Sequence, residues 1–101
     1  MRIAPLACVN PALSGWAFAA ESALQSGARG FGELRPGNQG WDPLGPESHR
    51  LCALAESAGV PLLWHVSEPV GHQYPGKSGG ISPADLITLA LDHPATPMVA
   101  A

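Results

Sequence analysis

A short apolar run, Pro61–Val66, constrains the fold of this chain more than any other stretch. It reads Pro-Leu-Leu-Trp-His-Val, with no alternation of polar and apolar side chains. Such a run is typical of a β-strand buried on both faces, which needs helices on each side of its sheet or a closed barrel. His65 stands near its carboxyl end, where α/β proteins bind ligands. The run therefore predicts a parallel α/β fold with a histidine in a functional position.

The rest of the chain alternates strand-like and helix-like segments. Strands are predicted at 3–9, 28–34, 61–66 and from 98 onward, and helices at 16–26, 46–58 and 83–92. A spacing of about thirty residues between strands is that of repeated β-α-β units. Right-handed crossovers between parallel strands give either an open doubly wound sheet or a sector of a barrel. We expect residues 1–101 to form one α/β domain of this kind.

Residues at the helix ends carry their own signals. Ser14 is predicted to cap the first helix, and Gly27 follows it where a left-handed residue is wanted. Pro46 suits the first position of the second helix. Ser82 followed by Pro83 predicts a capped start for the third.

Composition limits the classes of function. Only 13% of the 101 residues are charged, the net charge is −3 and the basic residues are scattered, which argues against a nucleic-acid surface. The two cysteines, Cys8 and Cys52, lie in predicted elements, and we expect buried reduced thiols in a cytoplasmic protein. No apolar stretch is long enough to span a bilayer, so no membrane partner is expected.

The amino-terminal segment allows a second interpretation. Arg2, the apolar run at 3–9 and Ala17-Phe18-Ala19 imitate a signal peptide with its cleavage site. Pro5 and Asn10-Pro11 interrupt that apolar region. A strand followed by a helix is therefore the preferred interpretation.

Glu33 and His65 fall at the ends of consecutive predicted strands. Since parallel strands end at one edge of a sheet, both side chains are expected on a common rim. Carboxylate and imidazole suit a divalent metal such as zinc, but zinc takes at least three protein ligands. Each residue alone is also explained as a polar strand end, so the pair leaves metal binding and a purely structural role open.

The segment after His65 matches the phosphate-loop pattern G-x-x-x-x-G-K-[ST] at 71–78. A phosphate loop must run straight into a helix, whereas here Gly79-Gly80 intervene before the helix predicted at 83–92. The segment is therefore interpreted as a loop that offers His72, Tyr74 and Lys77 to a substrate, or as a solvated loop. A non-catalytic module that binds an anionic or nucleotide ligand through residues 67–81 is the alternative function.

Four motifs resemble the amidohydrolase-related family: GFGELRP at 30–36, LCALAE at 51–56, GVPLLWHVSEP at 59–69 and GHQYPGK at 71–77. The glutamate and histidine framework is also similar to TatD-type metal-dependent deoxyribonucleases. The resemblance covers residues 28–101. It implies a (β/α)₈ barrel hydrolase for small-molecule substrates, in which Glu33 and His65 ligate a divalent metal, zinc by preference, that activates water.

The chain also departs from that family. No histidine precedes His49, so the family's H-x-H pair is absent, and its late aspartate has no counterpart. A full barrel needs about 200 residues. We therefore expect about half of a barrel, inactive alone, that holds metal only when the missing ligands are supplied. Half a barrel leaves two sheet edges unpaired, which predicts a marginal monomer or a homo-oligomer formed through those edges.

Overall fold

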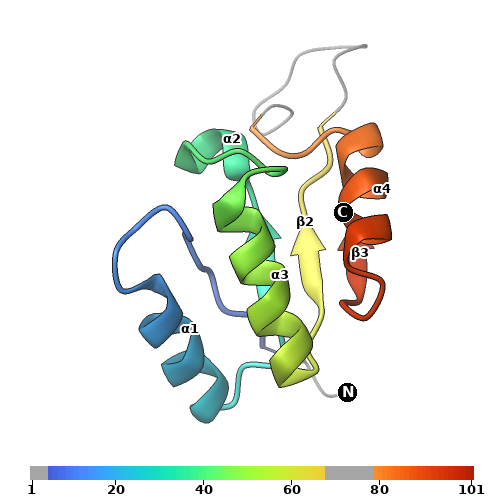
Figure 1. The fold of residues 1–101 in the computed structure, drawn as a ribbon. Helices are drawn as coiled ribbons and strands as arrows, with labels where there is room; N and C mark the ends of the chain where they lie inside the picture. The colour runs from blue at the N-terminus through green and yellow to red at the C-terminus, as the bar shows by residue number, and fades with distance from the viewer. Residues whose placement is uncertain (1–4, 68–78) are drawn as a thin grey trace.

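A computed structural model describes residues 5–67 and 79–101. The three strands form one parallel sheet in the order β1-β2-β3, as Figure 1 shows. The predicted α/β class with parallel strands is confirmed. The elements in chain order are α1 (Trp16–Gln25), β1 (Phe31–Leu34), α2 (Pro36–Gln39), α3 (Pro46–Ala58), β2 (Leu62–Trp64), α4 (Pro83–Asp92) and β3 (Met98–Ala100).

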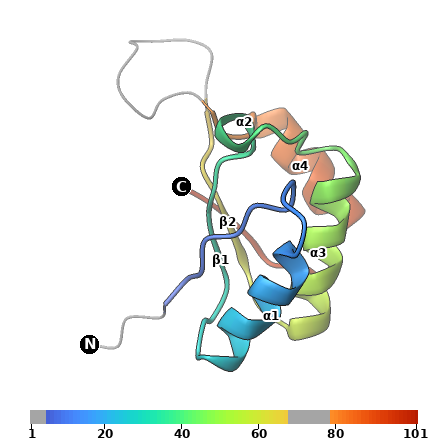
Figure 2. The ribbon, with the colours of Figure 1, turned by 90° about the vertical axis from the view of Figure 1, so that its left-hand side faces the viewer.

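The longer helices lie on one side of this sheet. Figure 2 shows α1, α3 and α4 against the same face of the strands. Successive side chains of a strand point to opposite faces, so only alternate residues of β2 meet these helices. Leu62 and Trp64 are fully buried, whereas Leu63 is partly exposed and its neighbour in β3, Val99, is 47% exposed. The prediction that this strand is buried on both faces is therefore wrong for the described residues.

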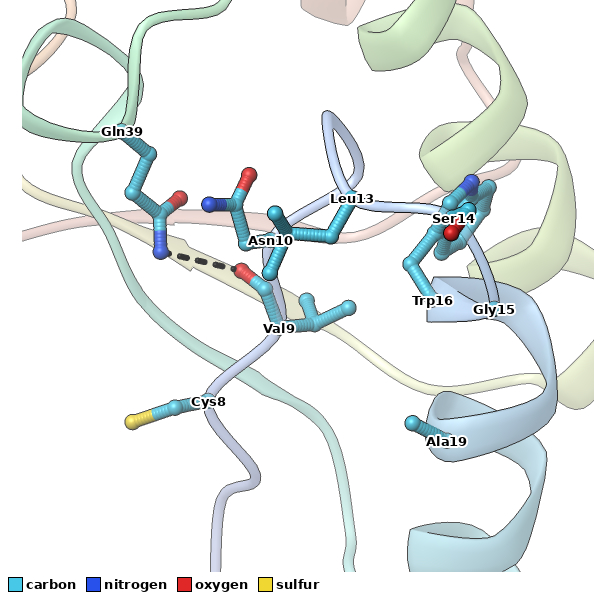
Figure 3. Close-up of a pocket in the computed structure, with 9 residues that line it drawn as sticks. All are labelled: Cys8, Val9, Asn10, Leu13, Ser14, Gly15, Trp16, Ala19 and Gln39. Carbon is cyan, nitrogen blue, oxygen red and sulfur yellow. Dashed lines mark hydrogen bonds between the residues drawn. The ribbon is translucent and has the colours of Figure 1, made fainter.

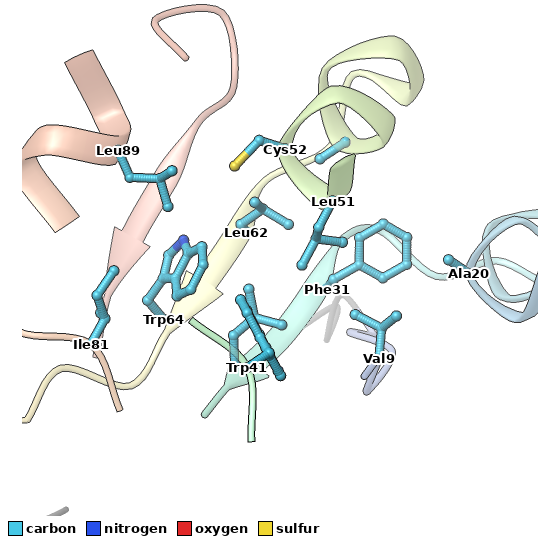
Figure 4. Packing of buried hydrophobic residues seen from close by; sticks show 12 residues of the cluster. Val9, Ala20, Phe31, Trp41, Leu51, Cys52, Leu62, Trp64, Ile81 and Leu89 are labelled. Carbon is cyan, nitrogen blue, oxygen red and sulfur yellow. The ribbon is translucent and has the colours of Figure 1, made fainter. Parts of the chain in front are cut away.

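The hydrophobic core fills the space between the sheet and the helices (Figure 4). Trp64 lies at its centre, and the Trp41 ring packs against it with 5.8 Å between ring centroids. Trp41 is only 5% exposed, and its Nε1 donates a hydrogen bond to Gln39 Oε1 at 2.8 Å. Trp41 is therefore a core residue, because the turn after α2 carries its ring inward.

Within the described part of the predicted first strand, residues 5–9, a single bridge joins Ala7 to Phe31. Ala7 N donates to Gly30 O at 3.0 Å and Gly32 N donates to Ala7 O at 3.1 Å, so the segment still runs along β1. A turn follows at Asn10, whose carbonyl oxygen accepts a hydrogen bond from Leu13 N at 3.1 Å.

The side chains of Cys8 and Val9, the two residues after Ala7, point to opposite sides of the chain segment. Val9 is buried in the core, whereas Cys8 is exposed. The expectation that Cys8 is buried is wrong, because its side chain points away from the helices that cover the other side.

The predicted helix starts are confirmed in two cases out of three. Ser82 Oγ accepts a hydrogen bond from Asp85 N at 3.1 Å, and Pro46 opens α3 as predicted. Ser14 does not cap α1. Gly15 occupies the cap position with φ of 78°, a left-handed conformation that favours glycine, and no side chain caps that helix.

Two leucines of α4 differ in burial, so substituting each of them tests this packing. Leu89 is fully buried, whereas Leu91 is 76% exposed. We expect Leu89→Ala to lower the free energy of unfolding by about 2–5 kcal/mol, because it opens a cavity in the core. Leu91→Ala should change it by less than about 0.5 kcal/mol. Urea denaturation measures both, and equal losses would contradict the described burial of α4.

Candidate functional site

A change of register in the sheet turns one side chain of β1 away from the core. Phe31 pairs with Leu62 and Leu34 pairs with Trp64, so three residue steps in β1 match two in β2. Phe31 and Leu34 are therefore both buried, although regular alternation would put them on opposite faces. Because of the extra residue, the Glu33 side chain does not point to the helix-covered face of the sheet, where Phe31 lies. Without this bulge, alternation would aim the Glu33 carboxylate at the helices.

Glu33 instead meets His65 at the carboxyl ends of the two strands. Glu33 Oε1 lies 3.2 Å from His65 Nδ1 and 2.8 Å from Arg35 Nη2. The side chains of Glu33 and His65 are 32% and 14% exposed. The structure therefore brings together the two residues that the sequence placed on a common rim. Arg35 was not among the predicted site residues, although its position two residues after Glu33 was the available signal.

This contact determines which nitrogen of His65 carries hydrogen. An ionised carboxylate oxygen can only accept, so a favourable contact with Glu33 requires hydrogen on Nδ1. The other nitrogen, Nε2, is buried and has no hydrogen-bond partner among residues 5–67 and 79–101. An unpaired buried nitrogen costs about 1–3 kcal/mol unless a donor or a metal reaches it. In this arrangement, a lone pair on Nε2 is what His65 offers to a ligand.

The segment that returns to α4 packs tightly against His65. Ile81 N donates to His65 O at 2.8 Å, and Ser67 N donates to Ile81 O at 2.9 Å. Gly80 N donates to Ser67 Oγ at 2.9 Å. A Cβ added at Gly80 would lie 2.7 Å from His65 Cδ2 and collide with the His65 backbone. Glycine at this position allows two chain segments to hold the histidine backbone in place.

The other predicted site residues, His72, Tyr74 and Lys77, lie outside the described residues, as does the phosphate-loop match at 71–78. After that match, the described chain packs Gly79 against Asn38 before α4 begins. Within residues 5–67 and 79–101, no three His, Cys, Asp or Glu side chains come together as a metal site. His65 and Glu33 are therefore two residues of metal-ligating types, fewer than the three protein ligands that zinc usually takes.

A cavity of about 330 Å³ lies elsewhere, where the first segment meets α1 (Figure 3). Val9, Leu13, Trp16 and Gln39 are among its lining residues. Gln39 Nε2 donates to Val9 O at 3.4 Å, as the dashed line in Figure 3 marks. Its lining includes neither Glu33 nor His65, so it is separate from the pair.

Cys52 is not a nucleophile in this fold. Its side chain is fully buried, and desolvation by this burial raises the pKa of the thiol to about 11. Near neutral pH the thiol is therefore almost entirely protonated, and the thiolate is the reactive form.

Comparison with protein-family models, curated proteins and solved structures found no match. The resemblance to the amidohydrolase-related family therefore stays a prediction that rests on sequence motifs. Among the described residues, no helix has the length and apolar character needed to cross a membrane.

The two thiols should react at very different rates. Cys8 is exposed and Cys52 is buried with a raised pKa. With Ellman's reagent at pH 8, we expect one thiol to react quickly and the second only after urea unfolds the chain. Cys8→Ser should remove the fast phase and Cys52→Ser the slow one. Two fast thiols in the native protein would contradict the burial of Cys52.

Proposed function

We propose that this chain contributes the Glu33–His65 part of a metal-dependent hydrolase site. One observation carries the proposal: His65 contacts a carboxylate through Nδ1 and holds Nε2 buried without a partner among the described residues. Histidines that ligate metals commonly donate their other ring nitrogen to a carboxylate, which fixes the tautomer and raises the basicity of the ligand. The donor set of the pair therefore fits a divalent metal of the zinc class.

The contacts assign different roles to the two residues. His65 would ligate the metal through Nε2. Glu33 would orient the imidazole through Oε1 rather than ligate the metal directly. Arg35 holds the same Oε1 at 2.8 Å, which restrains the carboxylate from the other side. A bound ion would supply Lewis acidity, lowering the pKa of water for attack on an amide, ester or similar bond.

The arrangement of the sheet supports a barrel-type fold, the finer part of the proposal. Strand order follows chain order, and α1, α3 and α4 cover one face. A doubly wound sheet instead has helices on both faces and a point where strand order reverses. The partly exposed Leu63 and Val99 would then face a barrel interior. We infer consecutive β-α-β units that make up about half of a (β/α)₈ barrel.

Zinc takes three or more protein ligands, so further ligands must join this pair. We propose that they come from residues other than those described, or from a second chain, and that the described part is inactive alone. His72, Tyr74 and Lys77 remain proposed substrate-binding residues on their sequence position. The substrate would be a small molecule with a hydrolysable bond.

A zinc titration followed through the His65 ring signals by NMR tests the proposal. We expect zinc to shift the His65 signals. Glu33→Gln should weaken the apparent affinity by about 10–100-fold, because it removes the charged partner of Nδ1. Glu56→Gln makes the same chemical change on the exposed face of α3 and should leave the affinity unchanged. His65 signals that ignore zinc, or an equal response in both variants, would argue against the proposal.

A further inference from the structure

A second pair of imidazoles lies away from the Glu33–His65 pair, between α3 and the end of α4. His49 Nδ1 and His93 Nε2 are 2.6 Å apart. The ring centroids are 4.9 Å apart and the rings are tilted by 41°. The centroid distance is about equal to the N–N distance plus the distance from each ring centre to its nitrogen. The two nitrogens therefore point at each other. Both residues are half-buried.

Two facing nitrogens this close must share one hydrogen. One ring donates an N–H and the other accepts through a lone pair. Neutral imidazole moves its hydrogen readily between its two nitrogens, so the donor can also present a lone pair. Both facing atoms can then act as metal ligands without a change in the charge of the pair.

Hydrogen bonds hold together the two backbone segments that carry these rings. Thr96 is buried, and its Oγ1 donates to Cys52 O of α3 at 3.1 Å. Thr96 N also donates to His93 O at 3.1 Å, and His93 N donates to Leu89 O at 3.0 Å. The turn that carries His93 is thereby tied to the helix that carries His49. Ligands held on fixed backbone lose little freedom when a metal binds.

We propose that His49 and His93 form a binding site for a divalent transition metal ion such as nickel, copper or zinc, which imidazole nitrogen suits. Zinc–nitrogen bonds of about 2.0–2.1 Å in tetrahedral geometry put two ligand nitrogens about 3.3 Å apart. The two nitrogens would need to separate by about 0.7 Å, and each ring would need to turn by roughly 35° so that its lone pair points at the ion, a rotation of half-buried side chains. Since the described residues provide no third ligand, water fills the other positions. The ion links the end of α4 to α3 and thereby stabilises the folded chain.

Thermal unfolding of the full chain with and without nickel chloride tests this site. A ligand that binds only the folded form raises its stability. At several times the dissociation constant, we expect nickel to raise Tm by about 4–8 °C, reversibly with EDTA. His49→Gln and His93→Gln should each abolish the rise when combined with His65→Ala, which removes any contribution of the proposed hydrolase site. His65→Ala, which alters the proposed hydrolase site, should keep it, so failure of one site is separable from failure of the other.

A spectroscopic measurement covers the case in which a variant does not fold. In the unaltered chain, substoichiometric copper(II) should broaden the ring signals of His49 and His93 before those of any other histidine. The proposal is overturned if nickel leaves the Tm of the His65→Ala chain unchanged, if the rise persists when His49→Gln is added to that chain, or if copper first broadens other signals.

Discussion

The parallel pairing of β1 with β2, with its one-residue change of register, is the constraint on which the candidate site depends. It lets Phe31 and Leu34 both enter the core opposite Leu62 and Trp64. Burial of two large apolar side chains at about 25 cal/mol per Å² favours this register over one that buries the Glu33 carboxylate. The hydrophobic core thus places an acidic residue at the rim, although that residue contributes nothing to the core itself.

Close approach of neighbouring backbones follows from the same pairing. A Cβ at Gly32 would lie 2.7 Å from Leu63 Cβ, and a Cβ at Gly30 would lie 2.7 Å from Pro61 O. A Cβ at Gly80 would collide with His65 in the same way. Backbone atoms cannot move aside as the end of a long side chain can. The glycines therefore let β1, β2 and the segment before α4 converge on the histidine.

The sequence predicted the elements with local signals. Helix α3 runs from Pro46 to Ala58 and is followed by Gly59, with φ of 70°, as expected. The short helix α2 was missed, although Pro36 at its start and Gly40 after it, with φ of 76°, are the usual signals.

Features that depend on distant partners were not predictable in this way. His49 and His93 are 44 residues apart, so no local pattern in the sequence links them. The bulge was equally hidden, because it is defined by the pairing of β1 with another strand and not by the residues of β1 alone. A strand without a bulge and with ordinary alternation would give the same local pattern of glycine and apolar residues.

The protonation of the His65 ring most directly tests the central claim that the strand pairing delivers Glu33 to this histidine. Nitrogen-15 NMR distinguishes the two neutral tautomers. The account predicts hydrogen on Nδ1 and a bare Nε2, with a shift toward the other tautomer in Glu33→Ala. Hydrogen on Nε2 in the unaltered chain, unchanged by that substitution, would contradict it.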